Sequence, residues 1–278
     1  MPAAEQITAT ILGCGSSGGV PRIGNNWGLC DPDNPRNRRR RCALLIEGRS
    51  ADSSEPTRVI IDTGCDLREQ LIDTKVDRVD AVFYTHEHAD HTHGIDDLRV
   101  LALNDRRRVD VYFSQQCGDR LQEAFAYCFE TAPGGEYPPI LSAHIIAAGD
   151  DVMIDGPGGS ISLHAFDQDH GGIQSLGYRV AGFAYSCDLS GIPEHSRAAV
   201  SGLDLWIIDA LRPLPHPSHL SLPESLALIA ERRPRQAVLT NLHVDMDYLT
   251  VEAQTPPNVT PAFDGMHIDV LSGTILNR

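Results

Sequence analysis

Histidine and acidic residues that could bind a metal gather in one short segment of the chain. Residues 86–91 read His-Glu-His-Ala-Asp-His and lie just beyond the apolar stretch 81–84. A turn beyond the end of a strand can direct several side chains to one side. Imidazole and carboxylate groups suit divalent zinc, manganese and iron. The segment therefore predicts a metal site, and a solvated polar turn is the alternative.

Further candidate ligands occur singly downstream, each near the end of a predicted strand. They are His170, Asp188 and His243. Taken alone, either histidine would be an ordinary hydrogen-bonded side chain, and the aspartate would cap a turn. Their order behind the first segment instead favours the convergence of all these residues on one site.

This pattern resembles the metallo-β-lactamase fold superfamily, over essentially the whole chain. Residues 12–21, Leu-Gly-Cys-Gly-Ser-Ser-Gly-Gly-Val-Pro, and residues 61–64, Ile-Asp-Thr-Gly, further resemble the PhnP and ribonuclease Z side of the superfamily. PhnP-type proteins are phosphodiesterases that act on a cyclic ribose phosphate. The resemblance implies a four-layer αββα sandwich with two divalent ions, zinc or manganese, and a hydroxide between the ions that attacks phosphorus.

Seven residues match the metal-ligand positions of the family: His86, His88 and His170 for the first ion, Asp90, His91 and His243 for the second, and Asp188 as the bridge between the ions. In the same family an aspartate that matches Asp62 hydrogen-bonds the metal loop and orients its ligands. Asp209 ends another predicted strand and could serve similarly. A turn carboxylate is the alternative for Asp62.

The phosphodiesterase branch also has a histidine beyond the metal ligands, which supplies a proton to the departing alkoxide. The matching position here is His219, just before the predicted helix 222–232. A histidine titrates near neutral pH and can donate that proton. The alternative is a polar residue at a helix start, and His216 is the nearest competitor. Asp90 and His219 are the candidate catalytic residues.

Two other segments admit two interpretations each. The glycine-rich residues 13–19 could bring backbone N–H groups near an anion or form a tight turn, but they lack the Gly-Lys-Ser/Thr of an ATP-binding loop. The arginines of residues 36–41 could lie on a solvated loop or anchor a phosphate or an acidic partner.

The chain departs from PhnP at one position. PhnP carries a structural zinc site with closely spaced cysteines and a histidine three residues beyond the last metal histidine. Here Cys30 and Cys42 are twelve residues apart, and Met246 stands where that histidine would be. We therefore expect no structural zinc, and the substrate of PhnP is a weaker guide here.

Composition bounds the remaining possibilities. The 278 residues carry a net charge of −15 and have 41% hydrophobic residues, which is typical of a folded globular chain. No linker divides the chain, and the resemblance then implies a single metallo-hydrolase domain over residues 1–278. The charge and the lack of a long basic insertion disfavour nucleic acid as a partner. No apolar run approaches the roughly 20 residues that cross a bilayer, and no signal peptide is evident. Seven scattered cysteines favour reduced thiols in the cytoplasm.

Short apolar runs separated by turns predict two packed sheets with helices outside. The predicted strands are 7–12, 42–47, 58–62, 80–85, 110–113, 160–166, 176–181, 183–186, 204–209, 236–240 and 267–271, and the predicted helices are 116–129 and 222–232.

We therefore predict a metal-dependent hydrolase, a di-metal phosphodiesterase that cleaves a small cyclic phosphate or nucleotide-like diester. One alternative is hydrolysis of a lactone, thioester or β-lactam on the same fold. The other is a metal-binding accessory protein without hydrolysis. We expect the protein to bind a small phosphorylated substrate and not to associate with a membrane. A homodimer is one option for its assembly. The sequence decides neither the leaving group nor the metal.

Overall fold

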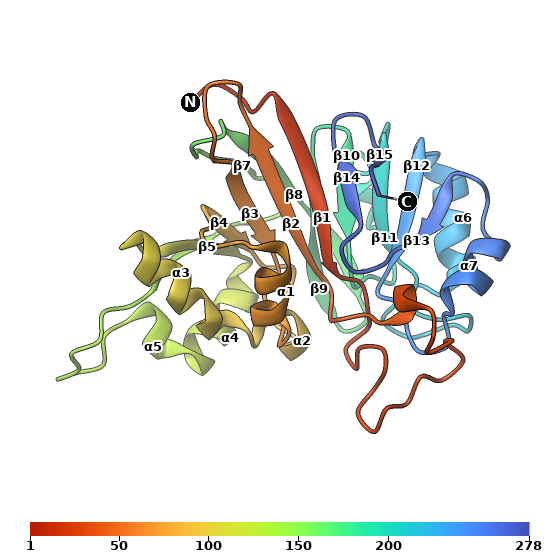
Figure 1. Cartoon of the computed structure of the whole chain (residues 1–278), viewed down its shortest axis with the longest axis horizontal. Helices are drawn as coiled ribbons and strands as arrows, with labels where there is room; N and C mark the ends of the chain where they lie inside the picture. The colour runs from red at the N-terminus through yellow and green to blue at the C-terminus, as the bar shows by residue number, and fades with distance from the viewer. Residues whose placement is uncertain (278) are drawn as a thin grey trace.

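The computed structural model describes residues 1–277 and contains two mixed β-sheets that pack face to face (Figure 1). The first sheet has the strand order β15-β14-β1-β2-β3-β4-β5-β6, and the second has the order β13-β12-β11-β10-β9-β8-β7. Helices α1 to α5 cover the outer face of the first sheet, and α6 and α7 cover that of the second. This arrangement confirms the predicted four-layer αββα sandwich.

The strands of the first sheet are β1 (Gln6–Gly13), β2 (Ala43–Arg49), β3 (Thr57–Ile61), β4 (Ala81–Phe83), β5 (Val109–Phe113), β6 (Leu141–Ile145), β14 (His267–Asp269) and β15 (Thr274–Ile275). Those of the second are β7 (Asp151–Ile154), β8 (Ile161–His170), β9 (Ile173–Val180), β10 (Phe183–Ser186), β11 (Leu205–Asp209), β12 (Gln236–Thr240) and β13 (Val259–Pro261). The helices are α1 (Leu67–Thr74), α2 (Ala89–Thr92), α3 (Leu98–Asp105), α4 (Gln115–Ala124), α5 (Ala126–Phe129), α6 (Leu222–Arg232) and α7 (Tyr248–Gln254), with short 3-10 turns at Pro35–Asn37, Ile95–Asp97 and Glu194–Ser196.

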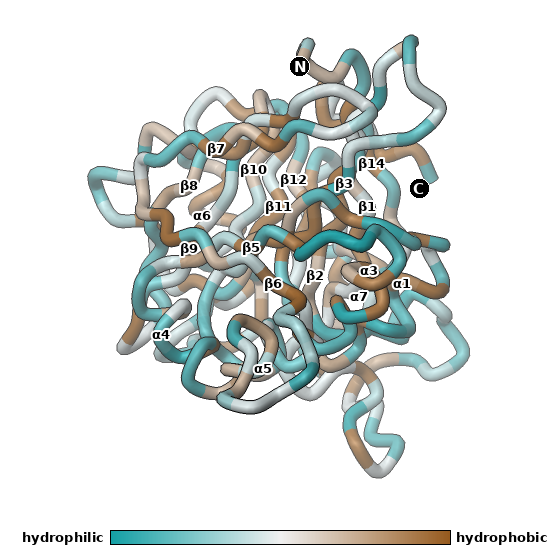
Figure 2. The backbone as a smooth tube through the Cα atoms, turned by 90° about the vertical axis from the view of Figure 1, so that its left-hand side faces the viewer, coloured by the Kyte–Doolittle hydropathy of each residue, from teal (hydrophilic) through white to brown (hydrophobic). Residues whose placement is uncertain are grey.

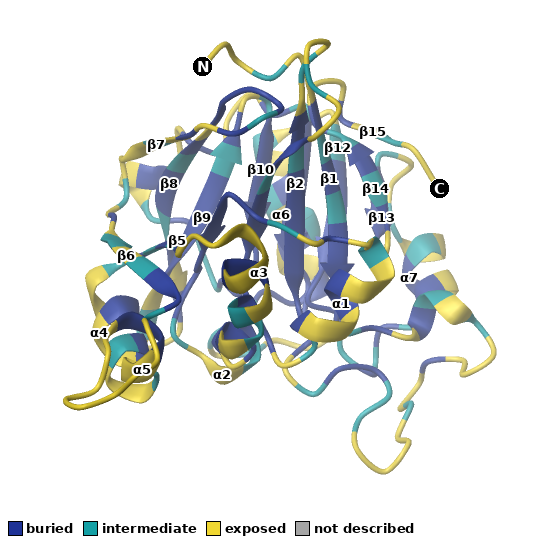
Figure 3. Ribbon diagram, turned by 60° about the vertical axis from the view of Figure 1, so that its left-hand side comes forward, coloured by how far each residue is buried: buried dark blue, intermediate teal, exposed yellow. Residues whose placement is uncertain are grey.

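Alternation of side chains along the strands builds three apolar layers. In β4, Ala81 and Phe83 point into the core between the sheets, whereas Val82 points to the layer under the helices. Both faces of such a strand are buried, which explains why the central strands read as continuous apolar runs (Figure 2). Helices α1 and α3 bury one side against the first sheet and expose the other (Figure 3).

The predicted helix over residues 116–129 is interrupted. Phe125 has φ −126° and ψ 38°, outside the helical region, and divides the segment into α4 and α5. The predicted helix 222–232 coincides with α6, where Ser221 and Glu224 form a capping box and Pro223 lies in the first turn.

Parallel neighbours bring the functional segments to one edge of the sandwich. Strands β3 and β4 run parallel, as do β10, β11 and β12, so the carboxyl ends within each set meet at one edge. Helix α2, which follows β4, lies at this edge (Figure 1). Among residues 1–277, no helix combines the length and apolar character needed to cross a membrane. That residues 1–278 form one domain stays a prediction, and residue 278 lies outside the described residues.

Candidate metal centre and active site

Four predicted ligands converge from three strand ends. The ligand atoms of one group all lie within 4.8 Å of one another, and its members are His86, His88, His170 and Asp188. His86 Nε2 lies 2.9 Å from His88 Nδ1, which in turn lies 3.3 Å from His170 Nε2. Three imidazoles and one carboxylate at this spacing fit a zinc-like or manganese-like ion.

The surroundings of His86 and His170 favour the neutral form of each imidazole. Burial lowers the pKa of His86 well below its usual value, and the neighbouring imidazoles lower it further. Burial also lowers the pKa of His170, whose Nδ1 lies 2.7 Å from the carbonyl oxygen of Ser218. If that nitrogen carries the proton and donates it to the carbonyl, Nε2 keeps the lone pair that faces the cluster.

Asp188 is held by its outer oxygen and presents the other to the cluster. Its Oδ1 accepts hydrogen bonds from Asn241 Nδ2 at 2.9 Å and from Cys187 Sγ at 3.1 Å. Its Oδ2 lies 3.7 Å from the Nε2 atoms of His86 and His170. Burial acts to raise the pKa of Asp188, but the facing imidazoles of His91, His86 and His219 together hold the pKa well below the usual range.

His91 and Asp90 adjoin the same aspartate from the other side. His91 Nε2 lies 3.4 Å from both Asp90 Oδ2 and Asp188 Oδ2. Its Nδ1 lies 2.7 Å from Asp62 Oδ2, and Asp62 also accepts from the backbone N–H and the hydroxyl of Thr85 at 2.8 and 2.9 Å. Asp62 thus lies where the resemblance implied, against the metal loop. Burial opposes charge on His91, yet the surrounding carboxylates raise its pKa well above the usual value.

His243 lies in the same cleft but outside these groups. Among the described residues it joins none of the sets of mutually close ligand atoms. Its Nε2 contacts the guanidinium of Arg22, and its Nδ1 lies 2.9 Å from Asp245 Oδ2. The structure therefore brings five of the seven predicted ligands into these groups, places Asp90 beside them through its contact with His91, and leaves His243 on the cleft wall.

His219 pairs with a buried carboxylate. Its Nδ1 lies 2.9 Å from Asp209 Oδ2, and its Nε2 lies 4.0 Å from Asp188 Oδ2. Burial acts against a charged ring, but Asp209 raises the pKa of His219 above its usual value. Within residues 1–277 no carboxylate pairs with His216, and burial lowers the pKa of His216. The geometry favours His219 over His216 as a proton donor toward the cluster.

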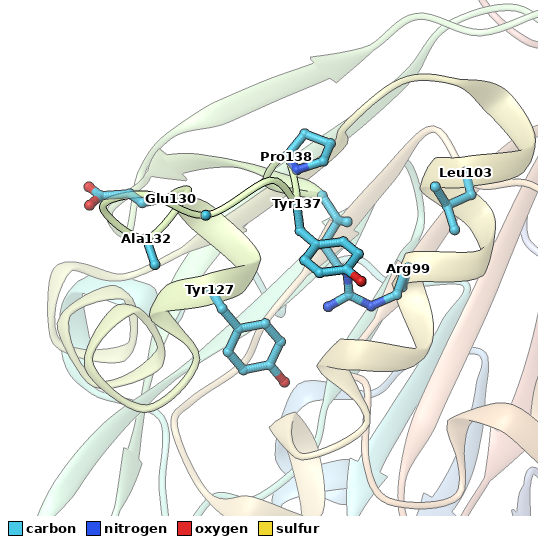
Figure 4. A pocket seen from close by; sticks show the side chains of 9 residues that line it. Arg99, Leu103, Tyr127, Glu130, Ala132, Tyr137 and Pro138 are labelled. Carbon is cyan, nitrogen blue, oxygen red and sulfur yellow. The ribbon is translucent and has the colours of Figure 1, made fainter.

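These groups line a cleft of about 420 Å³ whose walls are mainly polar. A larger cavity of about 540 Å³ lies between α3, α5 and residues 130–140 (Figure 4). Arg99, Tyr127 and Tyr137 contribute to its walls, and none of the predicted metal ligands does. The candidate site is therefore at the smaller cleft.

The chain matches the family model of the beta-lactamase superfamily domain over residues 57–241. It belongs to the metallo-β-lactamase superfamily. The family resemblance predicted from the histidine pattern is thus confirmed, and the protein is a metal-dependent hydrolase of this superfamily.

Three similar proteins can be compared with this chain. A solved structure described as a new diphosphatase from the PhnP family is 30% identical, with a TM-score of 0.83 over 95% of this chain and 96% of that one. Human tRNase Z, short form, is 19% identical, with a TM-score of 0.63 over 95% of this chain and 99% of that one, and shows the shared fold. A curated protein of Porphyromonas gingivalis (strain ATCC BAA-308 / W83) named octanoyltransferase is 28% identical over 92% of this chain. The chain spans about half the length of that protein, 50%.

The arginines of residues 36–41 mostly pack within this superfamily fold. Arg36 lies 4.8 Å from the ring centres of Tyr248 and Phe263, and Arg39 is buried. Arg40 and Arg41 pair with carboxylates, Asp264 and Asp66 among them. These contacts fix the long segment between β1 and β2 to the rest of the protein. Arg36, Arg39, Arg40 and Arg41 are therefore used in packing, rather than lying on a solvated loop or anchoring a phosphate. Arg38 is the exposed member of the group.

The glycine-rich residues 13–19 mainly form a tight turn. The Gly15 N–H donates to the Arg40 carbonyl and the Gly19 N–H donates to the Ser16 carbonyl, both at 2.7 Å. Those two N–H groups are therefore used within the protein. Ser16 and Ser17 nevertheless line the cleft.

The sequence interpretation missed several site residues. Asn241 and Cys187 donate hydrogen bonds to Asp188. Cys187 directly precedes Asp188, and Asn241 lies two residues before His243, so closeness in sequence to a predicted ligand could have indicated both. Arg22 and Arg212 also line the cleft. Nothing in the local sequence indicates that Arg22 meets a histidine 221 residues away.

Proposed function

We propose that this protein is a di-metal phosphodiesterase that hydrolyses a small cyclic phosphate or nucleotide-like phosphodiester. The observation that carries the proposal is His219, a histidine beyond the metal-ligand set with one nitrogen on Asp209 and the other facing Asp188. Cleavage of a phosphodiester expels an alkoxide that needs a proton, whereas lactone and β-lactam hydrolases of this fold need no such residue in general. The description of a 30%-identical relative as a diphosphatase supports chemistry at phosphorus.

The donor set supports two ions. His86, His88 and His170 would hold the first, and Asp188 would be shared. Asp90 and His91 would hold the second, and His243 would complete it from the cleft wall. Divalent ions bound there would lower the pKa of water to supply the nucleophile and would neutralise charge on the phosphoryl oxygens.

The chain itself contributes orientation and proton transfer. Asp62 and Thr85 fix the ring of His91, while Asn241 and Cys187 fix the carboxylate of Asp188. Asp209 accepts from His219 Nδ1, which leaves Nε2 directed toward the reacting group. With Nδ1–H on Asp209, the charged ring that the raised pKa of His219 favours also carries a proton on Nε2, and it can deliver that proton to the leaving oxygen.

The name of the Porphyromonas gingivalis relative raises octanoyl transfer as another activity. That protein is about twice as long as this chain, so its name does not say which part acts. An octanoyl chain needs an apolar pocket. Among the described residues that line the cleft, Leu211 alone has an aliphatic side chain. The cleft therefore favours a polar, anionic substrate.

The test uses bis-p-nitrophenyl phosphate with metal-loaded protein. We expect hydrolysis. Because p-nitrophenolate leaves without a proton, the role of His219 is tested on 2′,3′-cyclic AMP, whose leaving group is an alkoxide. His219→Ala should lower kcat for that ester by about 10²–10⁴-fold with metal content unchanged. His195→Ala, an exposed histidine paired with Asp167, is the matched control. Turnover of nitrocefin, a homoserine lactone or lactoylglutathione without any diester hydrolysis would overturn the proposal.

A further inference from the structure

A groove on the helices that cover the first sheet lies away from the metal cluster. The cavity of about 540 Å³ between α3, α5 and residues 130–140 continues into a second cavity of about 370 Å³, because the two share Leu103, Pro138 and Ile140 in their walls (Figure 4). We call the two cavities together the outer groove. Within residues 1–277, no residue that lines the outer groove also lines the cleft of the candidate metal centre. The groove is therefore separate from the chemistry proposed above.

Large apolar side chains around the outer groove remain in contact with solvent. The exposed fractions of Leu103, Tyr127 and Tyr137 are 64%, 51% and 83%. Helix α3 buries Leu98 and Leu101 against the first sheet, so Leu103 is not needed there. A contiguous exposed apolar surface on a soluble protein marks a site of interaction. Walls this open would leave much of a small ligand in water, whereas ligand pockets bury most of their ligand, so a segment of a macromolecule fits the groove better.

One end of the outer groove carries three consecutive arginines. Residues 106–108 all line the smaller cavity, and all three are exposed. Arg107 pairs with Asp110 at 3.2 Å. Within residues 1–277, however, no carboxylate oxygen lies within 4.0 Å of the side-chain nitrogens of Arg106 or Arg108. Two unpaired guanidinium groups beside exposed apolar surface, in a chain with a net charge of −15, indicate that a partner supplies the carboxylates.

The rest of the outer groove has no free positive charge. Arg99 in its wall is paired with Asp96 at 2.7 Å, and its guanidinium carbon lies 5.7 Å from the ring centre of Tyr127. Glu130 lines the larger cavity, and Glu136 is exposed on the same loop. A uniformly anionic surface, such as a lipid bilayer, would meet these carboxylates as well as the arginines. A segment with acidic groups at one end only would avoid that repulsion.

We propose that the outer groove binds a linear peptide segment of a partner protein. Aromatic or aliphatic side chains of the segment pack against Leu103 and Tyr137, and acidic side chains at one of its ends pair with Arg106 and Arg108. A concave apolar surface suits such a segment, because a few anchor side chains fill the hollow while charges at one end fix the direction of binding. This interaction goes beyond the hydrolysis proposed above and does not depend on it.

The test selects phage-displayed random linear peptides on the immobilised wild-type protein. We expect the enriched peptides to combine aromatic or aliphatic residues with acidic residues at one end. Leu103→Asp should weaken the binding of an enriched peptide by about tenfold or more, measured by fluorescence anisotropy, because it places a carboxylate in the apolar part of the groove. Leu249→Asp is the matched control: this leucine of α7 is 59% exposed, and its replacement should leave the affinity unchanged.

A charge swap tests the basic end of the groove separately. Arg106→Glu should weaken the enriched peptide by about fivefold or more at low ionic strength. Replacing the acidic residues of the peptide by lysine should restore its affinity for this variant and weaken its binding to wild type. Arg233→Glu is the control, because Arg233 and Arg106 are both exposed and both end a helix in the left-handed conformation, with φ of 55° and 50°.

Four results would overturn the proposal. One is the absence of enriched peptides, and another is equal affinity of an enriched peptide for wild type and Leu103→Asp. Analytical ultracentrifugation would give the third, a wild-type dimer that dissociates in Leu103→Asp, which would assign the groove to a second copy of the chain. Sedimentation with phosphatidylserine vesicles would give the fourth, vesicle binding that is lost in Arg106→Glu, which would assign the groove to a lipid surface.

Discussion

Asp188 is the residue on which the candidate centre depends most. It lies in the left-handed backbone region, with φ 54°, and is almost fully buried. A non-glycine residue keeps such a conformation only where its surroundings determine it, here through the donors Asn241 and Cys187. One oxygen is thereby fixed, and the other faces the Nε2 atoms of His86, His91 and His170.

We expect Asp188→Ala to lower the occupancy of both metal positions, because it removes the shared ligand. Elemental analysis of purified protein measures this directly, and stoichiometry should fall below that of wild type at each metal concentration. Asp52→Ala, at an exposed loop position, serves as the control. Unchanged stoichiometry in the Asp188 variant would contradict its assignment as the bridge.

Helix α6 positions His219, the proposed proton donor, because the helix begins at Leu222, directly after the cap residue Ser221. Ser221 caps the helix together with Glu224, and the Ser225 hydroxyl donates to the Asp209 carbonyl at 2.6 Å. The helix start therefore joins the two partners of the His219–Asp209 contact. Local stability of α6 should affect both the fold and the site.

Replacing the cap should destabilise the protein. Ser221→Ala is expected to lower the free energy of unfolding by about 1 kcal/mol, measured by urea denaturation at pH 7. The hydrogen bonds from Ser221 lower the pKa of Glu224 below its usual value of 4.5, so the charged carboxylate contributes stability above that pH. The difference between wild type and Glu224→Ala should shrink as the pH falls below about 4. A difference that persists or grows there would contradict the capping role.

Sequence patterns predicted the elements that are long or strongly apolar. Strand β12 and helix α6 match residue for residue, since their apolar spacing and caps are local signals. Short helices such as α1 and α3 were missed because burial against the sheet, rather than a strong local signal, stabilises them. The break at Phe125 was missed for a different reason: the four-residue apolar spacing continues across it.

The sequence indicates the candidate ligands but not every residue that lines the cleft. Residues 86–91 are adjacent in sequence, and the order of the later ligands follows a known family. Arg22 could not be predicted, because its approach to the cleft depends on a hairpin packed against Val244 far along the chain. Such contacts are set by tertiary packing, which leaves no periodic signal.

The two sheets supply different halves of the candidate metal centre. His86, His88 and His91 follow β4 of the first sheet, whereas His170 ends β8 and Asp188 follows β10 of the second. Near the same edge, the Tyr178 hydroxyl donates to the Tyr84 carbonyl at 2.6 Å across the interface. An ion bound by both groups would cross-link the layers, so metal binding should stabilise the sandwich as a unit.

Metal-linked stability can be measured without any substrate. At free zinc or manganese about 100 times above its Kd, the folded state should gain about 2.7 kcal/mol for each ion bound, and a chelator should reverse the resulting rise in Tm. Scanning calorimetry with and without metal gives the shift. Asp188→Ala should lose most of it, because the ligands from the two sheets then lack their shared carboxylate, while Asp52→Ala should keep it. An equal shift in wild type and Asp188→Ala would mean that the stabilising ion binds elsewhere, and that the two sheets are not joined through this centre.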